Sequence, residues 1–291
     1  MITSKFDNFD SAQKSKKIFD IKEIKCKNCM TKSKLTDYVI NPYTGCEHGC
    51  RYCYADFMRR FQNIKENWGD FVYAKINCPE LLAQELEKNK PGHIWLSSVC
   101  DCYMPIESRF KLTRKILEII SNSKFKNKFT IEILTKSALV RRDFDLLKKL
   151  NIELGMSINT INDDIARIIE PLASPPSLRI ETLRLAKNNG IKVFGFISPV
   201  IPGITKLNEI FSKLEFVDYV WVELLNTKKS VLDRLIPLIK QKFPQAMKDF
   251  DFAISNPNEY YKKIEKEIRE LEKKHKIKVR EIVRHDLKMK S

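Results

Sequence analysis

Glycine is scarce in this chain, with only 8 among 291 residues, which excludes a collagen-like repeat. No apolar run approaches the roughly 18–20 residues of a membrane span. The first residues, MITSKFDNFDSAQKSKK, lack the apolar centre of a secretion signal. Internal repeats and low-complexity segments are also absent from the sequence. We therefore expect a cytoplasmic protein that makes no membrane contact. Because thiols stay reduced in the cytoplasm, the eight cysteines indicate metal binding or catalysis more than disulfides.

The composition is that of a globular protein with a strong basic excess. Hydrophobic residues make up 43% and charged residues 31% of the chain, which excludes a disordered polyelectrolyte and allows a substantial core. The length fits one large domain or two small ones. The net charge of +16 favours an anionic partner, such as a nucleic acid, a phosphorylated substrate or an acidic protein. An equally open interpretation of this charge is that lysine-rich faces are solvated and bind no partner.

Apolar, strand-like runs alternate with amphipathic stretches through the middle of the chain. The predicted strands are Tyr38–Asn41, His93–Cys100, Phe129–Thr135, Ile152–Ile158, Lys192–Ser198 and Tyr219–Leu224. The predicted helices are Leu112–Ser121, Val140–Leu150, Leu178–Asn188 and Val231–Lys242, while the apolar run Phe71–Ile76 stands outside the alternation. Six strand–helix units predict an α/β fold with a parallel sheet, either an open barrel or a doubly wound sheet. Ligands then bind at the carboxyl ends of the strands.

Three segments are predicted along the chain. Residues 1–36 form a polar, lysine-rich N-terminal extension, 37–242 form the strand–helix array, and 243–291 form a helical and basic C-terminal cap. Apolar residues at three- and four-residue steps predict a helix over Asn258–Lys274. The segment Ile277–Val283 that follows is predicted to be a strand or a second helix.

The most informative motif is Asn41-Pro-Tyr-Thr-Gly-Cys-Glu-His-Gly-Cys-Arg-Tyr-Cys-Tyr54, directly after the first predicted strand of the array. Its Cys-x3-Cys-x2-Cys spacing places Cys46, Cys50 and Cys53 on one short loop. Three thiolates can hold three irons of a cubane (4Fe–4S) cluster and leave the fourth iron open. Glycines 45 and 49 allow tight turns around the sulfurs. Zinc is the alternative, since His48, Cys26 and Cys29 are available as a fourth ligand.

The motif, with an aromatic residue before the last cysteine, resembles the radical S-adenosylmethionine (radical SAM) superfamily. With Tyr52 and Tyr54 it is most similar to the spore photoproduct lyase-like, DNA photolyase-related branch, and the likeness extends over roughly residues 37–226. It includes Ser97-Ser-Val-Cys-Asp-Cys-Tyr-Met-Pro-Ile-Glu107, Ile133-Leu-Thr-Lys-Ser137 and Ser198-Pro-Val-Ile-Pro-Gly203. The resemblance implies a partial (β/α)6 TIM-like barrel. It also implies that the cluster reductively cleaves S-adenosylmethionine (SAM) to a 5′-deoxyadenosyl radical, which abstracts a hydrogen atom from a substrate.

The resemblance also implies roles for individual residues at the carboxyl ends of the predicted strands. Lys136, Ser157 and Ser198 match positions that contact SAM, and Ser98 and Cys100 are further candidates for this contact. Tyr52 is expected to pack near the cluster and the adenine, as a candidate catalytic and cofactor-binding residue. Arg179 either anchors Glu170 or reaches the methionyl carboxylate, and the salt bridge is the favoured interpretation. Polar residues end five predicted strands, as a mouth that binds a zwitterion and a ribose requires.

One departure from the lyase concerns the second strand of the array. The lyase has a hydrogen-donating cysteine where this chain has Ser98, and Cys100 falls where the lyase has a serine that contacts SAM. If the strand is regular, Ser98 and Cys100 share a face. Cys100 is then a candidate redox-active or hydrogen-donating thiol, with a small buried residue as the alternative. Cys26, Cys29, Cys100 and Cys102 are enough for an auxiliary metal site.

Three functions remain open at this point. The first is a radical SAM enzyme with an external one-electron donor of the flavodoxin or ferredoxin type, acting on an unidentified substrate for which nucleic acid is one candidate. The second is a non-enzymatic iron–sulfur carrier or sensor. The third is a zinc-dependent nucleic-acid binding module.

Overall fold

A computed structural model describes residues 19–61 and 63–285 of the chain, and statements about structure concern these residues. The strands are β1 (Asp20–Ile24), β2 (Met30–Lys32), β3 (Tyr38–Ile40), β4 (Tyr43–Gly45), β5 (Phe71–Lys75), β6 (Gly92–Leu96), β7 (Phe129–Thr135), β8 (Ile152–Ser157), β9 (Lys192–Val200), β10 (Tyr219–Leu224) and β11 (Val279–Val283). The α-helices are α1 (Met58–Phe61), α2 (Cys78–Lys88), α3 (Glu107–Phe110), α4 (Leu112–Asn122), α5 (Phe144–Leu147), α6 (Asp163–Ile169), α7 (Pro176–Asn188), α8 (Leu207–Lys213), α9 (Lys229–Lys242), α10 (Met247–Ser255) and α11 (Pro257–His275). Short 3-10 helices are η1 (Tyr54–Phe57), η2 (Lys126–Lys128), η3 (Ala138–Asp143) and η4 (Pro244–Ala246).

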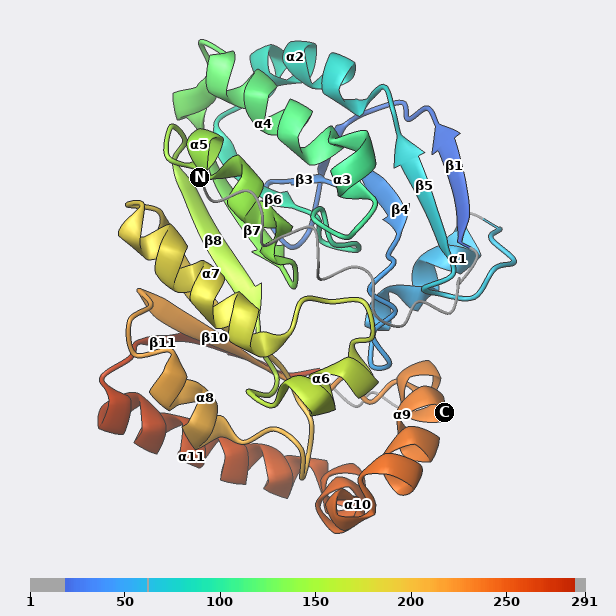
Figure 1. The fold of residues 1–291 in the computed structure, drawn as a ribbon, viewed down its shortest axis with the longest axis vertical. Helices are drawn as coiled ribbons and strands as arrows, with labels where there is room; N and C mark the ends of the chain where they lie inside the picture. The colour runs from blue at the N-terminus through green and yellow to red at the C-terminus, as the bar shows by residue number, and fades with distance from the viewer. Residues whose placement is uncertain (1–18, 62, 286–291) are drawn as a thin grey trace.

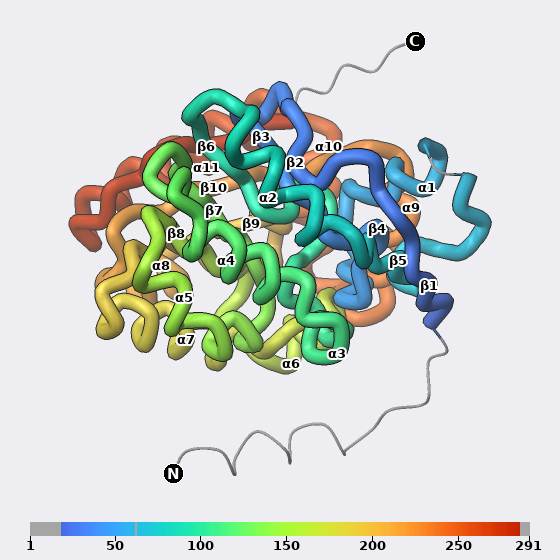
Figure 2. Tube along the Cα trace, turned by 90° about the horizontal axis from the view of Figure 1, so that it is seen from above, coloured from blue at the N-terminus to red at the C-terminus, as the bar shows by residue number. Residues whose placement is uncertain are grey.

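The six predicted strands of the array are all present and form one parallel sheet. The sheet has the order β11-β10-β9-β8-β7-β6-β3-β2, in which all neighbours are parallel except the antiparallel pair β2 and β3. Helices such as α4, α7 and α8 cover its outer face (Figure 1). No described strand joins β2 to β11, so the sheet is curved but open, as the partial-barrel prediction requires. Seen from above, α2 and α4 lie side by side on the end of the molecule nearest the viewer (Figure 2).

The two ends of the chain contribute strands that the sequence interpretation did not commit to. In the predicted N-terminal extension, β1 pairs with β5 and β2 pairs with β3, whereas residues 1–18 lie outside the described part of the chain. The run around Phe71 is β5, in a separate sheet of the order β1-β5-β4. In the predicted helical cap, β11 adds a further parallel strand beside β10. The predicted helix Asn258–Lys274 is α11, whereas Val140–Leu150 is shorter than predicted and is divided between η3 and α5.

Inside the sheet, Glu132 of β7 is buried beside another carboxylate. It is 3% exposed, and its cross-strand neighbours are Trp95 of β6 and Glu153 of β8. His93 Nε2 lies 3.9 Å from its carboxylate. Glu153 itself is paired with Lys192 and Arg280. Burial and the charge of Glu153 raise the pKa of Glu132 to about 7.

We predict that Glu132→Gln stabilises the protein in a pH-dependent way. Because the pKa of Glu132 is higher in the folded state than in the unfolded chain, the folded state is increasingly penalised as pH rises from about 4.3 to about 7. The variant should gain roughly 1–3 kcal/mol in unfolding free energy at pH 8 and little at pH 4. Urea unfolding at both pH values measures this, with Glu281→Gln at an exposed position of β11 as the control. Equal gains at both pH values would contradict the prediction.

Candidate SAM and iron–sulfur site

The loop that carries the cysteine motif begins where β4 ends. Gly45 and Gly49 have positive φ angles of 87° and 58°, which confirms the tight turns expected at these positions. A side chain at residue 45 would overlap the carbonyl oxygen of Phe71, so glycine is required there. The backbone N–H of Cys53 donates to the carbonyl of Cys50 at 3.1 Å, which closes the last turn of the motif.

Three other parts of the chain hold this loop in place. The N–H of Arg51 donates to the carbonyl of Ile169 at the end of α6 (2.9 Å). The carboxylate of Glu47 accepts from the N–H of Ile106 at 2.5 Å. From α9, the Arg234 guanidinium donates to the carbonyls of Arg51 and Cys53 and pairs with Asp56 at 2.7 Å. The positions of the cysteines are therefore fixed by contacts from distant sequence.

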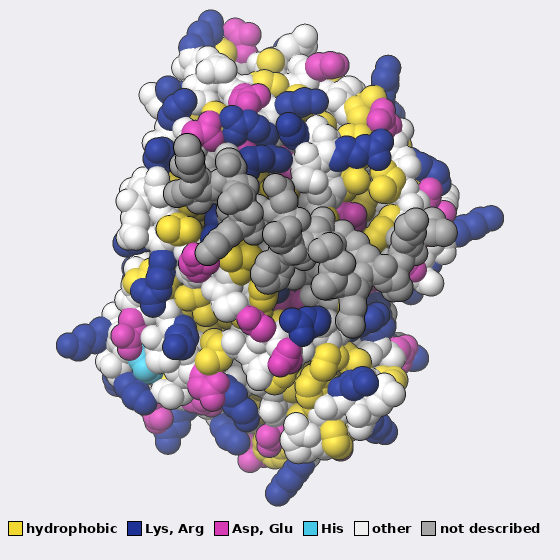
Figure 3. Space-filling view, in the orientation of Figure 1, with side chains coloured by type: hydrophobic (Ala, Val, Ile, Leu, Met, Phe, Trp, Pro, Cys, Tyr) yellow, Lys and Arg dark blue, Asp and Glu magenta, His cyan; other side chains and the backbone are white. Residues whose placement is uncertain are grey.

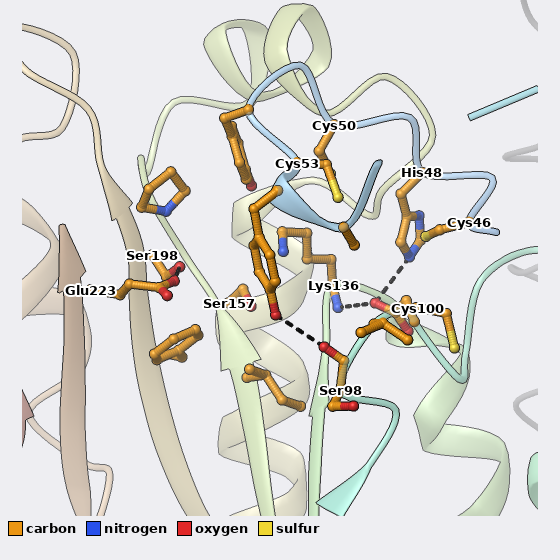
Figure 4. A pocket seen from close by; sticks show the side chains of 18 of the residues that line it. Cys46, His48, Cys50, Cys53, Ser98, Cys100, Lys136, Ser157, Ser198 and Glu223 are labelled. Carbon is orange, nitrogen blue, oxygen red and sulfur yellow. Dashed lines mark hydrogen bonds and ion pairs between the residues drawn. The ribbon is translucent and has the colours of Figure 1, made fainter. Parts of the chain in front are cut away.

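The cysteine loop forms one wall of a cavity at the carboxyl ends of the parallel strands (Figure 4). Ser198 and Glu223 lie on the opposite wall, with Lys136 and Ser157 between them and the loop (Figure 4). The predicted site residues that line the cavity are Cys46, Cys50, Tyr52, Cys53, Ser98, Cys100, Lys136, Ser157 and Ser198. Of the predicted set, only Arg179 does not line it.

The thiols of Cys46, Cys50 and Cys53 are free and lie on the same wall of the cavity. Among the described residues, no group of three or more Cys, His, Asp or Glu side chains is arranged to hold a single metal ion. A cubane differs from such a site because each cysteine binds its own iron, so the three sulfurs need not converge on one point. The three free thiols of the motif fit a cluster that takes one ligand from each of them and leaves one iron open.

His48 lies within the motif but is engaged elsewhere, which argues against the zinc alternative. Its Nδ1 lies 3.0 Å from the carbonyl of Leu172, and its Nε2 lies 3.1 Å from the carboxylate of Asp101. Asp101 also accepts from the Thr135 hydroxyl and from the N–H of Lys136, both at 2.7 Å. Burial would raise the pKa of Asp101, but the facing imidazole and these hydrogen bonds hold it well below its usual range.

Lys136 follows the last residue of β7 and extends beside the motif. Its Nζ lies 5.8 Å from the centre of the Tyr52 ring. Among the described residues, the ammonium has no hydrogen bond or ion pair. Burial opposes its charge, but Cys50 and Glu170 outweigh this effect and raise the pKa of Lys136 above its ordinary value. A cation in the cavity without a protein counterion is suited to bind an anionic group of a ligand.

Arg179 occupies the favoured one of its two predicted positions. It is fully buried and forms a salt bridge with Glu170. It also donates to the carbonyls of Ser157 at 2.9 Å and Ser174 at 2.6 Å. Glu170 in turn accepts from the Tyr52 hydroxyl and from the Asn159 amide. Arg179 therefore positions the end of β8 and the ring of Tyr52 and does not itself face the cavity.

The cavity wall around Ser198 includes residues that the sequence interpretation missed. The hydroxyl of Ser198 donates to Glu223, and Nε2 of His285 lies 3.0 Å from the other oxygen of the same carboxylate. His285 follows β11, so only a commitment to a parallel strand at residues 279–283 would have placed it at this edge. Trp68, Trp95 and Phe196 also line the cavity and had no predicted role.

The regular strand that was predicted through Ser98 and Cys100 is wrong. The strand β6 ends at Leu96, and Ser97 has a positive φ of 72°. Both residues nevertheless line the cavity, since the chain turns across its floor. The sulfur of Cys100 lies 3.4 Å from the Ser97 hydroxyl. Burial raises the pKa of Cys100 to about 11, so its thiol keeps its hydrogen at neutral pH. The hydrogen-donor role of Cys100 stays a prediction.

The predicted auxiliary metal site at Cys26, Cys29, Cys100 and Cys102 is not formed. Cys29 is bonded to Cys78, the first residue of α2, so the expectation that the cysteines would avoid disulfides is also wrong for this pair. Glu85 of α2 accepts the N–H groups of Cys29 and Met30, which fixes this segment against the helix. Cys102 is fully buried and Cys26 bonds Asn77, so neither lines the cavity with Cys100.

Comparison with known proteins agrees with this arrangement. The sequence profile of the Radical SAM superfamily matches residues 40–212. The chain belongs to the radical SAM superfamily. Membership implies an enzyme with a 4Fe–4S cluster and SAM, which decides among the three functions in favour of the first. The described part of this radical SAM chain has no helix that is long and apolar enough to cross a bilayer.

Among curated relatives, this radical SAM chain is 37% identical over 259 residues to an uncharacterized protein of Methanocaldococcus jannaschii, which covers 88% of the chain and 94% of that protein. It is 31% identical to an uncharacterized protein of Acidianus two-tailed virus, over 70% of the chain and 72% of that protein. Among solved structures, it resembles a spore photoproduct lyase variant with bound AdoMet and dinucleoside spore photoproduct. The TM-score is 0.55 at 18% identity, over 78% of this chain and 66% of the lyase.

A second structure, a substituted spore photoproduct lyase, gives a TM-score of 0.56 at 19% identity, over 78% of this chain and 67% of the lyase. At this identity the likeness shows the fold alone. The chain spans about two thirds of the length of the lyases that it matches. The resemblance to the radical SAM superfamily and the predicted partial-barrel fold are both confirmed.

Proposed function

We propose that this enzyme holds a 4Fe–4S cluster on Cys46, Cys50 and Cys53, binds SAM at the open iron, and abstracts a hydrogen atom from a substrate in the same cavity. One observation carries the proposal. Three free thiols, the Lys136 ammonium and the polar strand ends at Ser157 and Ser198 all line one cavity, and the ammonium has no ion pair with any described residue. With cluster and cofactor bound, the chemistry supplied is reductive cleavage of SAM and hydrogen-atom abstraction.

The residues of the chain bind and orient the cofactor. Lys136 supplies the positive charge for its carboxylate, and the Ser157 hydroxyl supplies a hydrogen bond for its ribose or amino group. The backbone near Ser198 contacts the adenine of SAM. The Tyr52 hydroxyl donates to Glu170, so its ring packs against the site and its proton is not directed into the cavity. We therefore assign Tyr52 a packing role and Arg179 a positioning role, in place of the catalytic and cofactor-contacting roles first considered.

A nucleic acid is the substrate class that we favour. The net charge of +16 suits a polyanion, and aromatic side chains on which a base can stack, such as Trp95 and Phe196, line the cavity. A structurally similar lyase is described with a bound dinucleoside spore photoproduct, which supports the same class. Cys100 is the candidate thiol to return a hydrogen atom to the substrate radical.

Lys136→Met tests the cofactor part of the proposal. We expect the wild-type protein, reconstituted without oxygen and reduced, to convert SAM to 5′-deoxyadenosine and methionine. The variant should keep its iron but bind SAM at least about tenfold more weakly, because a charge that faces the cofactor carboxylate is lost. Its thermal stability should change little, since among the described residues the ammonium has no hydrogen bond or ion pair. Calorimetric titration and chromatography measure binding and cleavage.

Lys115→Met, an exposed position on α4, is the matched control for the Lys136 experiment. A Lys136→Met variant that binds SAM as tightly as wild type would remove Lys136 from the site. Failure of the wild-type protein to release any 5′-deoxyadenosine would refute the proposed function itself.

A further inference from the structure

The outer side of the cysteine loop carries an exposed basic and aromatic surface. We define the cluster-loop surface as Arg51, Phe57, Arg60, Phe61 and Lys228. Arg51, Arg60 and Lys228 are exposed, and Phe61 is 77% exposed. In the part of the chain that the structure describes, none of these three cations forms a salt bridge, while the nearby Asp56 is taken by Arg234. The surface therefore presents positive charge without internal compensation.

Direct contacts join Phe57, Phe61 and Lys228, although Lys228 comes from a separate segment, and Arg60 precedes Phe61 in α1. The rings of Phe57 and Phe61 meet edge to face at 5.9 Å, and the ammonium of Lys228 lies 6.0 Å from the centre of the Phe57 ring. Phe57 also stacks on Tyr54, which lines the cavity. Arg234 of α9 donates to the carbonyl of Arg51 and pairs with Asp56, the residue before Phe57, which links Arg51 to the same part of the loop. An exposed phenyl ring together with exposed cations has the composition of a protein interface.

The surface includes an exposed residue between two of the proposed cluster ligands. Arg51 is exposed, whereas Cys50 next to it is buried and Cys53 is half-buried, so solvent reaches the loop close in sequence to the ligand sulfurs. The inner side of the loop faces the cavity that the cofactor is proposed to fill. Electron transfer weakens steeply with distance, so the outer side of this loop is the favourable place for an electron to enter.

We infer that the cluster-loop surface docks an acidic one-electron carrier, a flavin or iron–sulfur protein, that reduces the cluster. The inference rests on the proposed function. In the transfer, the reduced carrier loses one electron and the cluster gains it, passing from the 2+ to the 1+ state, and no bond forms or breaks. Transient electron-transfer complexes need only a small interface. Complementary charge then controls the association rate more than the affinity.

The overall charge does not by itself locate this partner. Lys and Arg side chains are spread over the face shown in Figure 3 and alternate with Asp and Glu. A general electrostatic attraction would therefore act from many directions. The inference depends instead on three exposed cations on and beside the cysteine loop that form no salt bridge with another described residue, and it predicts that charge elsewhere on the molecule has little effect.

The test compares two reductants in the reconstituted, iron-loaded protein. Reduction of the cluster is followed by stopped-flow absorbance, with fully reduced bacterial flavodoxin as the protein donor and photoreduced 5-deazaflavin as the small donor. The variant is Arg51→Glu/Arg60→Glu. The matched control is Lys213→Glu/Lys278→Glu, two exposed positions on α8 and just before β11. Iron content and thermal unfolding establish that each variant is folded and loaded.

At low salt, we expect the Arg51→Glu/Arg60→Glu variant to lower the second-order rate with flavodoxin at least about tenfold, with no change in the 5-deazaflavin rate. The wild-type flavodoxin rate should fall as salt is raised, and the variant rate should depend on salt much less. The control variant should behave like wild type. The single variants Arg51→Glu and Arg60→Glu should each lower the flavodoxin rate by less than the double variant does.

An unchanged flavodoxin rate in the double variant would overturn the inference. If that variant instead loses affinity for a fluorescent single-stranded oligonucleotide while its flavodoxin rate is unchanged, the surface belongs to nucleic acid and the inference is equally overturned. These results differ from failure of the proposed function, in which the wild-type protein holds no reducible cluster with either donor.

Discussion

Replacing Cys46, Cys50 and Cys53 together by alanine will remove all iron from the anaerobically reconstituted protein. The three thiols are free and lie on one cavity wall, and we assign each of them to one iron. The free thiol of Cys100 lines the same cavity but is a single ligand, which cannot hold a cluster alone. The wild-type protein should bind about four irons and four sulfides per chain. Colorimetric iron and sulfide analysis, together with absorbance near the visible cluster bands, measures the loss.

Cys26→Ala is the matched control for the triple variant, because Cys26 is a free thiol outside the cavity. It should keep the full iron content. Circular dichroism and thermal unfolding establish whether the triple variant is folded, so that loss of iron is not confused with loss of structure. Iron that remains in a folded triple variant would contradict the ligand assignment and would require a second cluster elsewhere.

Arg179→Met will destabilise the protein by about 3–5 kcal/mol, because it leaves a buried carboxylate without its cation. Arg179 and Glu170 are both fully buried, and the guanidinium also satisfies the carbonyls of Ser157 and Ser174. Burial would raise the pKa of Glu170, but Arg179 and Lys136 hold it below its usual value. The stability that this depressed pKa supplies is present above about pH 4.3 and is lost as pH falls below it.

Urea unfolding of the apoprotein at pH 7 measures the effect of Arg179→Met without any contribution from cofactors. Arg184→Met, on the same helix α7 but exposed over the ring of Phe216, should cost no more than about 1 kcal/mol. Similar losses for the two variants would contradict the structural role of the buried pair. Because Glu170 also accepts from the Tyr52 hydroxyl, Arg179→Met should weaken SAM binding even where it remains folded.

The parallel strands could be predicted because each is buried on both faces and is therefore a continuous apolar run. Phe129–Thr135 and Tyr219–Leu224 have the predicted bounds. The end of β6 could not be predicted from the sequence, since nothing in the run from His93 to Cys100 marks Leu96 as the last residue of the strand. The turn there depends on a positive φ at Ser97, a residue type with no strong preference for that conformation.

The cysteine motif could be identified from the sequence because its three cysteines lie within one short loop. The rest of the site depends on contacts between segments that are distant in the sequence. Cys29 and Cys78 are separated by 49 residues, and their spacing gives no indication that β2 and α2 meet. His285 reaches the cavity only because β11 pairs with β10. The cluster-loop surface likewise combines α1 with the residue before α9. The domain limits at 36 and 242, the cytoplasmic location and the individual residue roles stay predictions.

The most direct test of the account is electron paramagnetic resonance of the reduced, reconstituted protein before and after SAM is added. We expect the signal of one reduced 4Fe–4S cluster whose g values change when SAM binds, because the fourth iron has no protein ligand. A spectrum that SAM leaves unchanged, or the absence of any 4Fe–4S signal in protein that retains its iron, would contradict it.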